Sequence, residues 1–200
     1  MVHPDPQSTV ALRLKEDTRV AHEALEARLL PFLEAITDAD AYAHLLRAFY
    51  SFYGALETKI AAALPPDALP DLGARRKAGW LLEDLKTLGD TNLPGALPQR
   101  FLPTIDDEAA AWGALYVLEG SSLGGRLICR MIAKQFPAAP LRFFNGYGSD
   151  TGPLWVRFLA ALEQAGSQLS YPEINRSATH TFQSFDLWLQ QQLPVMSKAH

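Results

Sequence analysis

The sequence of 200 residues has a single cysteine, Cys129, so no disulfide can form within the chain. Such sparing use of cysteine is typical of a reducing compartment, and we expect the protein to be cytoplasmic. Basic residues are not in excess. The formal net charge of −4 argues against nucleic acid as the main partner, because there is no surplus of cations to neutralise phosphates. No apolar run approaches the length of a membrane span, and residues 1–8 lack the apolar core of a signal peptide, so no membrane association is expected.

The chain also lacks sustained alternation of polar and β-branched residues, so no β-sheet is expected. Prolines instead divide it into segments with helical periodicity. Helices are predicted over residues 9–30, 37–64, 74–88, 112–136, 153–169 and 173–193. No repeat or break in composition marks a second domain. We therefore predict an all-α, single-domain helical bundle over residues 9–194, with a flexible tail at 1–8 and a second tail at 195–200.

The segment WGALYVLEGSSLGGRLICRMIAKQF, residues 112–136, combines helical periodicity with glycines inside the predicted helix. Each interior glycine costs about 1 kcal/mol relative to alanine. Gly113, Gly120 and Gly124 share one helical face with Val117, and a glycine face allows close approach of either another helix or a flat ligand.

A second pattern lies near the N-terminus, where helical spacing places Lys15, Arg19, His22 and Glu26 on one stripe. A neutral imidazole is a good iron ligand, and a carboxylate one turn away can fix its tautomer. The same spacing also describes a surface histidine among alternating charges. The stripe alone does not decide between these interpretations.

The segments LKEDTRVAHEALE, AYAHLLRAFYSFYGALETKI and YVLEGSSLGGRLI, in that order, resemble heme oxygenases. The resemblance extends from residue 12 to about 131 and continues through GYGSDTGPLWVRFLAALE. It is closest to the bacterial branch often associated with bacteriophytochromes. It implies an enzyme for which heme is both cofactor and substrate, and which cleaves heme to biliverdin, carbon monoxide and ferrous iron. Dioxygen and an external electron donor, such as a ferredoxin or a reductase, would be required, and a bacteriophytochrome could accept the biliverdin.

The resemblance also implies roles for individual residues. His22 would be the proximal ligand of the heme iron, and Glu26 would be its hydrogen-bonding partner. The distal helix would lie over the other face of the porphyrin through the backbone of Gly120, Gly124 and Gly125. The basic side chains that would face the heme propionates are Lys15, Arg19 and, in a looser alignment, Arg157.

The sequence departs from the family at Ser121, where many members have an aspartate directly after the first distal glycine. A serine can hydrogen-bond to water but supplies no charge. The distal proton network is therefore expected to use Ser121 or Ser122 with water, or to be built from other residues. Two alternatives stay open: a heme-binding or heme-carrying protein of the same fold with little turnover, and a non-heme helical protein that binds another small molecule.

Overall fold

The structure is a computed structural model that describes residues 9–92 and 94–193. Within these ranges the chain forms helices and no strands, which confirms the predicted all-α class. The α-helices are α1 (Val10–Asp17), α2 (Arg19–Glu34), α3 (Ala39–Ala63), α4 (Ala78–Thr87), α5 (Glu108–Gly120), α6 (Gly125–Gln135), α7 (Arg142–Asn145), α8 (Thr151–Gly166) and α9 (Tyr171–Gln192). Short 3₁₀ helices are η1 (Leu72–Arg75), η2 (Gln99–Phe101), η3 (Ser121–Gly124) and η4 (Gly148–Asp150).

The predicted tails, residues 1–8 and 195–200, lie outside the described residues, as does Pro194. None of the helices in the described part of the chain has the length and hydropathy needed to cross a membrane.

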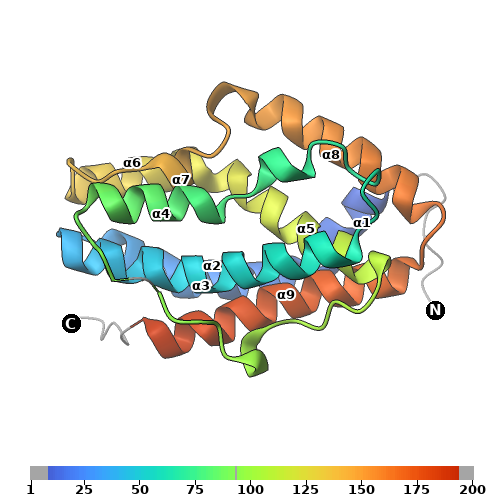
Figure 1. Ribbon diagram of the computed structural model, residues 1–200, viewed down its shortest axis with the longest axis horizontal. Helices are drawn as coiled ribbons and strands as arrows, with labels where there is room; N and C mark the ends of the chain where they lie inside the picture. The colour runs from blue at the N-terminus through green and yellow to red at the C-terminus, as the bar shows by residue number, and fades with distance from the viewer. Residues whose placement is uncertain (1–8, 93, 194–200) are drawn as a thin grey trace.

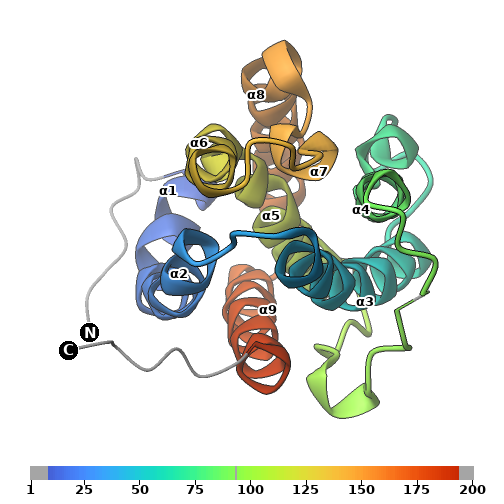
Figure 2. The same ribbon diagram turned by 90° about the vertical axis from the view of Figure 1, so that its left-hand side faces the viewer.

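Helix α5 is the centre of the bundle. The long helices α3 and α9 lie along the long axis of the molecule (Figure 1), and the end view shows α5 surrounded by α2, α3, α6, α8 and α9 (Figure 2). The sequence explains this position, because nearly every residue of α5 from Ala109 to Glu119 is buried. A helix that is apolar on all sides is stable only when other elements cover it.

Two aspartates cap the N-termini of helices. The Asp38 carboxylate accepts a hydrogen bond from the backbone N–H of Ala41 at the start of α3, at 2.9 Å. The Asp107 carboxylate does the same for Ala110 in α5, at 2.8 Å. Each satisfies a backbone donor that the first helical turn leaves without an intrahelical partner.

The first predicted helix differs from the structure in its middle and at its C-terminal end. It breaks at Thr18 into α1 and α2, and α2 then continues through Pro31 to Glu34, so the prediction that Pro31 ends the helix is wrong. The Thr18 hydroxyl donates to the Leu14 carbonyl at 2.7 Å, a local bond that competes with the helical pattern and bends helices. Pro31 removes one helical hydrogen bond near the end of α2, and the burial of Phe32 and Leu33 offsets this loss.

The predicted single helix over residues 112–136 is also wrong. The chain forms α5, then η3, then α6, and the change of helical type falls at the serine- and glycine-rich residues 121–124. The Ser121 hydroxyl donates to the Leu118 carbonyl at 2.7 Å, again competing with the regular ladder. Residues 141–152, predicted as non-helical, contain the single-turn helix α7 and the 3₁₀ helix η4.

Helices α5 and α9 approach closely at Gly113. A Cβ atom added to Gly113 would lie 2.2 Å from the Ile174 carbonyl oxygen and 2.9 Å from the Ala178 amide nitrogen, both backbone atoms of α9. The Ser177 hydroxyl donates to the Ala110 carbonyl at 2.6 Å in the same contact. A glycine is therefore required at position 113 by helix packing.

We predict that Gly113→Ala lowers the free energy of unfolding by about 1–3 kcal/mol, the usual cost of overpacking a core. Gly79→Ala is the control, because a Cβ at this position in α4 meets no atom within 4 Å. The control should be neutral or stabilising by up to about 1 kcal/mol. Urea denaturation measures both, and equal stabilities of the two variants would contradict the packing requirement.

Candidate functional site

The structure brings the predicted iron ligand and its partner together on α2. His22 Nε2 lies 3.3 Å from Glu26 Oε1, and the His22 side chain is 52% exposed. The other contact of the imidazole is with Phe182 of α9, whose ring centroid is 5.2 Å away. Because the Glu26 contact is made by Nε2, iron ligation by that nitrogen requires the imidazole and the carboxylate to rearrange.

The predicted basic residues do not form one group. Arg19 of α2 pairs with Glu23 of the same helix at 3.2 Å and with Glu16 of α1 at 3.5 Å. Lys15 is exposed on α1 and makes no ion pair within the described residues. Arg157 lies on α8, where its guanidinium is 4.0 Å from Asp71. All three have solvent-exposed side chains that are free to reorient.

Residues 120–125, which we call the distal segment, join α5 to α6 through η3. Its glycines have different surroundings. A Cβ at Gly125 would lie 2.0 Å from the Phe144 carbonyl oxygen, so packing against α7 already requires this glycine. At Gly124 a Cβ would meet no atom within 4 Å, and at Gly120 only the Trp155 ring at 3.9 Å. Gly120 and Gly124 therefore leave backbone open to a ligand.

The serines of the distal segment also differ. Ser121 is exposed, and its hydroxyl proton is committed to the Leu118 carbonyl, which leaves its lone pairs to accept hydrogen bonds. Ser122 Oγ is buried without a hydrogen-bond partner among the described residues.

Tyr53 of α3, which was not predicted from the sequence as a site residue, is buried beside Ser121. Burial raises the Tyr53 pKa well above its ordinary value, so the phenol stays protonated.

The distal segment and the start of α6 expose two large apolar side chains. Leu123 is 51% exposed and Leu127 is 53% exposed, although α6 is otherwise an amphipathic helix with Ile132 fully buried. A further unsatisfied atom, Asn175 Oδ1, is buried on α9. It lies on the same helical face as Tyr171, which donates to Asp17 of α1, and Phe182, which contacts His22.

Helix α2 packs against α6, the helix that follows the distal segment. Helix α2 contacts both α9 and α6, and α5 packs more extensively on α9 than any other pair of helices in the described chain. Figure 2 shows α2 next to α6 and α9, with α5 behind them. The helix that carries His22 and the helix that follows the distal segment are thus neighbours in the bundle.

A buried charge cluster precedes the distal segment. Glu119 is only 2% exposed, and it accepts hydrogen bonds from Arg75 Nη1 at 2.5 Å, Lys77 Nζ at 2.5 Å and the Tyr147 hydroxyl at 2.9 Å. Arg75 also donates to Asp71, at 2.7 and 2.9 Å. Burial lowers the pKa of Lys77, and the negative charge of Glu119 opposes that shift.

This cluster was not predicted from the sequence, although two residues of the sequence indicate it. Glu119 is the one charged residue in the apolar run ALYVLEG, and Glu57 interrupts the aromatic and aliphatic face of α3. A carboxylate on a buried helical face requires partners, since an unpaired buried charge is very costly. Glu57 accepts from the backbone N–H groups of Lys77 at 2.5 Å and Ala78 at 3.1 Å.

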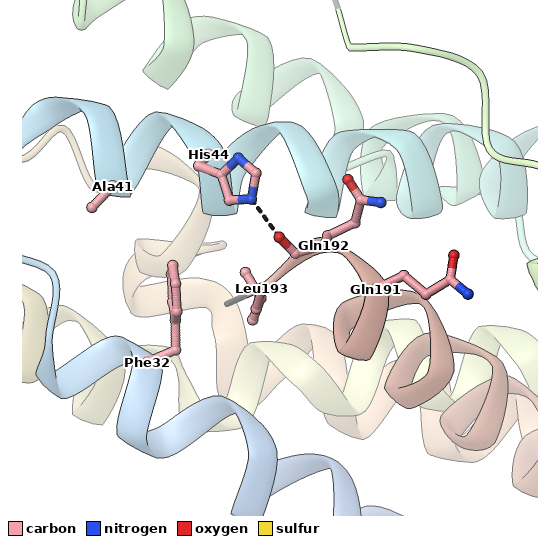
Figure 3. A pocket seen from close by; sticks show the side chains of 6 residues that line it. All are labelled: Phe32, Ala41, His44, Gln191, Gln192 and Leu193. Carbon is pink, nitrogen blue, oxygen red and sulfur yellow. Dashed lines mark hydrogen bonds between the residues drawn. The ribbon is translucent and has the colours of Figure 1, made fainter. Parts of the chain in front are cut away.

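Two cavities lie away from His22 and the open glycines. One, of about 470 Å³, is lined by Phe32, Ala41, His44, Gln191, Gln192 and Leu193. There the His44 Nε2 donates to the Gln192 carbonyl at 2.5 Å (Figure 3). The second, of about 170 Å³, lies between Leu115 and Leu118 of α5 and the residues around Glu57. Neither is lined by His22, Gly120 or Gly124.

Comparison with known structures establishes the fold. The chain is similar to the NO- and CO-bound heme oxygenase from Neisseria meningitidis, with a TM-score of 0.74 and 24% identity over 94% of this chain and 95% of that one. It is also similar to the heme oxygenase from Leptospira interrogans, with a TM-score of 0.72 and 19% identity over 92% of this chain and all of that one. At these identities the likeness concerns the fold.

Sequence comparison goes further. The heme oxygenase family matches residues 8–93. A curated heme oxygenase of Xanthomonas campestris pv. campestris (strain 8004) is 40% identical over 129 residues, which cover 64% of this chain and 74% of that protein. With this degree of identity over most of a curated relative, the chain belongs to the heme oxygenase family.

Proposed function

We propose that the protein has heme oxygenase activity and binds heme between α2 and the distal segment, with His22 as the iron ligand. The observation that carries this proposal is the pairing of His22 with Glu26 on a helix that packs against α9 and α6, together with the open backbone of Gly120 and Gly124 in the segment that leads into α6. Family membership supports heme as the substrate.

The residues around the proposed site fit a porphyrin. A large, flat, apolar ligand would cover Leu123 and Leu127, whose exposure is otherwise unfavourable, and would lie against backbone that has no side chain at Gly124. The buried polar atoms Ser122 Oγ and Asn175 Oδ1 lack partners within the described protein, as expected near a binding site for another molecule.

Heme, when bound, would supply both the carbon skeleton that is cleaved and the iron that binds dioxygen. The chain's own residues would orient it and handle protons. His22 would hold the iron while Glu26 accepts a hydrogen bond from the other ring nitrogen, fixing the tautomer and raising the basicity of the ligand. Lys15 and Arg19 would face the propionates, and Arg157 would do so only after leaving Asp71.

On the distal side we propose that Ser121 accepts hydrogen bonds, because its own proton is directed to the Leu118 carbonyl. The protonated Tyr53 beside it is the candidate donor. This arrangement would replace the aspartate that many family members have after the first distal glycine. A serine whose proton is engaged is also the feature that favours the alternative of a heme carrier with little turnover.

Electrons would come from a separate donor, a ferredoxin or a reductase. We propose a cytoplasmic location, in keeping with the single cysteine, and a bacteriophytochrome as acceptor of the biliverdin. The reaction itself is tested by incubating the purified wild-type protein and hemin with each class of electron donor and measuring biliverdin formation.

We predict that hemin titration of the wild-type protein gives a saturable Soret shift with one hemin per chain, and that His22→Ala lowers hemin affinity by about tenfold or more, because the ligand bond is lost. His180→Ala is the matched control, since His180 is an exposed histidine on α9. Addition of a reductant and dioxygen to the wild-type complex should then produce a biliverdin band.

The two parts of this experiment separate the candidate functions. Identical titrations of wild type and His22→Ala, or diffuse binding without saturation, would exclude ligation by His22. A normal hemin complex that yields no biliverdin with any electron donor would instead identify a carrier.

A second prediction concerns the open distal glycine. Gly124→Leu should leave the free energy of unfolding within about 1 kcal/mol of wild type, since a Cβ there meets no atom within 4 Å. It should nevertheless weaken hemin binding by about tenfold to a hundredfold, the effect of 1–3 kcal/mol of overpacking against a bound ligand.

Gly73→Leu is the matched control for this substitution, because Gly73 also lies in a 3₁₀ helix with no atom within 4 Å of an added Cβ. It should bind hemin as wild type does. Unchanged hemin affinity of Gly124→Leu would show that the ligand does not lie against this glycine.

A further inference from the structure

We propose that residues 144–147, which we call the support segment, hold the distal segment at a fixed height over the heme, and that Tyr147 and Glu119 are positioning residues for the distal face. This inference rests on the proposed heme site. Neither residue is placed in contact with heme. Their effect would be exerted through the backbone of residues 120–125.

The support segment lies close to the distal segment or its preceding residue at three points. The Phe144 carbonyl lies where a Cβ of Gly125 would be, 2.0 Å from that position. A Cβ at Gly146 would lie 3.8 Å from Ser122 Cβ, an ordinary packing distance. The Tyr147 hydroxyl donates to Glu119 at 2.9 Å, directly before Gly120. The contacts therefore lie at Gly125, near Ser122 and at Glu119, the residue directly before the distal segment.

The support segment is itself anchored to α4. The buried Asp84 carboxylate accepts hydrogen bonds from the backbone N–H groups of Arg142 and Phe143, each at 2.9 Å, at the start of α7. The Tyr147 ring packs edge-on against Trp80 with centroids 5.3 Å apart. Through these contacts the position of the distal segment depends on α4, which lies on the far side of the segment from α2 (Figure 2).

The backbone around Tyr147 is suited to this role. Gly146 and Gly148, on either side of it, have φ angles of +55° and +59°, a region that residues with a Cβ rarely adopt. The reversal that they allow turns the Tyr147 side chain inward to Glu119. The Arg142 guanidinium closes the turn by donating to the Gly146 carbonyl at 2.7 Å.

Glu119 ties this turn to the rest of the bundle. Its carboxylate accepts hydrogen bonds from Arg75 and Lys77, in and directly after η1, in addition to the one from Tyr147. Arg75 also donates to the Leu154 carbonyl of α8 at 3.2 Å. The last residues of α5 are thus held directly by the η1 region and by Tyr147, and through Arg75 they are linked to α8. A buried carboxylate with several directional donors has little freedom to move, so the glycine-rich backbone that follows begins from a fixed point.

Carbon monoxide bound to the ferrous hemin complex is a probe of the distal face that does not depend on turnover. Tyr147→Phe removes one hydroxyl and keeps the ring contact with Trp80. We expect it to bind hemin as wild type does and to change the CO dissociation rate by about 2- to 30-fold, the range in which residues remote from a ligand modulate its binding. The C–O stretching band should broaden or split, because the distal segment is no longer held in one position.

Tyr42→Phe is the matched control. It also removes a tyrosine hydroxyl that donates a hydrogen bond, in this case to the partly buried Pro140 carbonyl at 2.7 Å, but it does not touch the distal segment. Both variants should raise the equilibrium constant for unfolding by about tenfold, the usual effect of losing one buried hydrogen bond. Only Tyr147→Phe should alter CO binding. Glu119→Gln should change it in the same way, although the loss of charge beside Arg75 and Lys77 threatens folding.

The outcomes separate this inference from the proposed function. If wild-type protein binds hemin through His22 but Tyr147→Phe and Tyr42→Phe have the same CO dissociation rate and the same C–O band, the support segment does not position the distal face. If wild type fails to form a saturable hemin complex, the proposed heme site itself is wrong.

Discussion

The carboxylate of Glu119 is the interaction on which the candidate site depends. It pairs with both Arg75 and Lys77 in the protein interior, where either cation alone would be strongly unfavourable, and Asp71 supplies the second negative charge beside Arg75. A buried ion pair contributes little net stability, but removing one partner costs about 3–5 kcal/mol. The consequence is geometric. The end of α5, the η1 region and the turn at Tyr147 can only be assembled in the arrangement that satisfies all of these charges.

Helix α9 performs the corresponding task for the other side of the site. It packs so closely on α5 that Gly113 can carry no side chain, and it contacts α1 and α2 through Tyr171 and Phe182. The His22 stripe and the glycine-rich backbone are therefore positioned against a common helix. Their relative placement follows from backbone packing in the core, while the side chains that would bind the ligand stay exposed.

The all-α class and most helices follow from apolar periodicity, aspartate caps and prolines, as the agreement at α3, α4, α8 and α9 shows. The breaks do not. Thr18 and Ser121 interrupt helices through hydroxyl bonds to carbonyls on the preceding turn, and such bonds are also compatible with an unbroken helix. Helix α2 continues through Pro31 because the burial of Phe32 and Leu33 favours helix at these positions. Tertiary packing decides whether the helix breaks or continues at each of these residues, and the local sequence pattern carries no information about that packing.

The same limit explains why the candidate site was predicted only in part. His22 and Glu26 could be predicted as a pair because their contact is set by helical spacing alone. The glycines could not be sorted, since Gly113 and Gly125 serve close packing against α9 and α7 while Gly120 and Gly124 face open space. Glycine at all of these positions has the same local cost. Only the tertiary neighbours distinguish a glycine that is required for close packing from one that leaves room for a ligand. Both kinds of glycine occur in the distal segment, directly after the residue that Tyr147 holds.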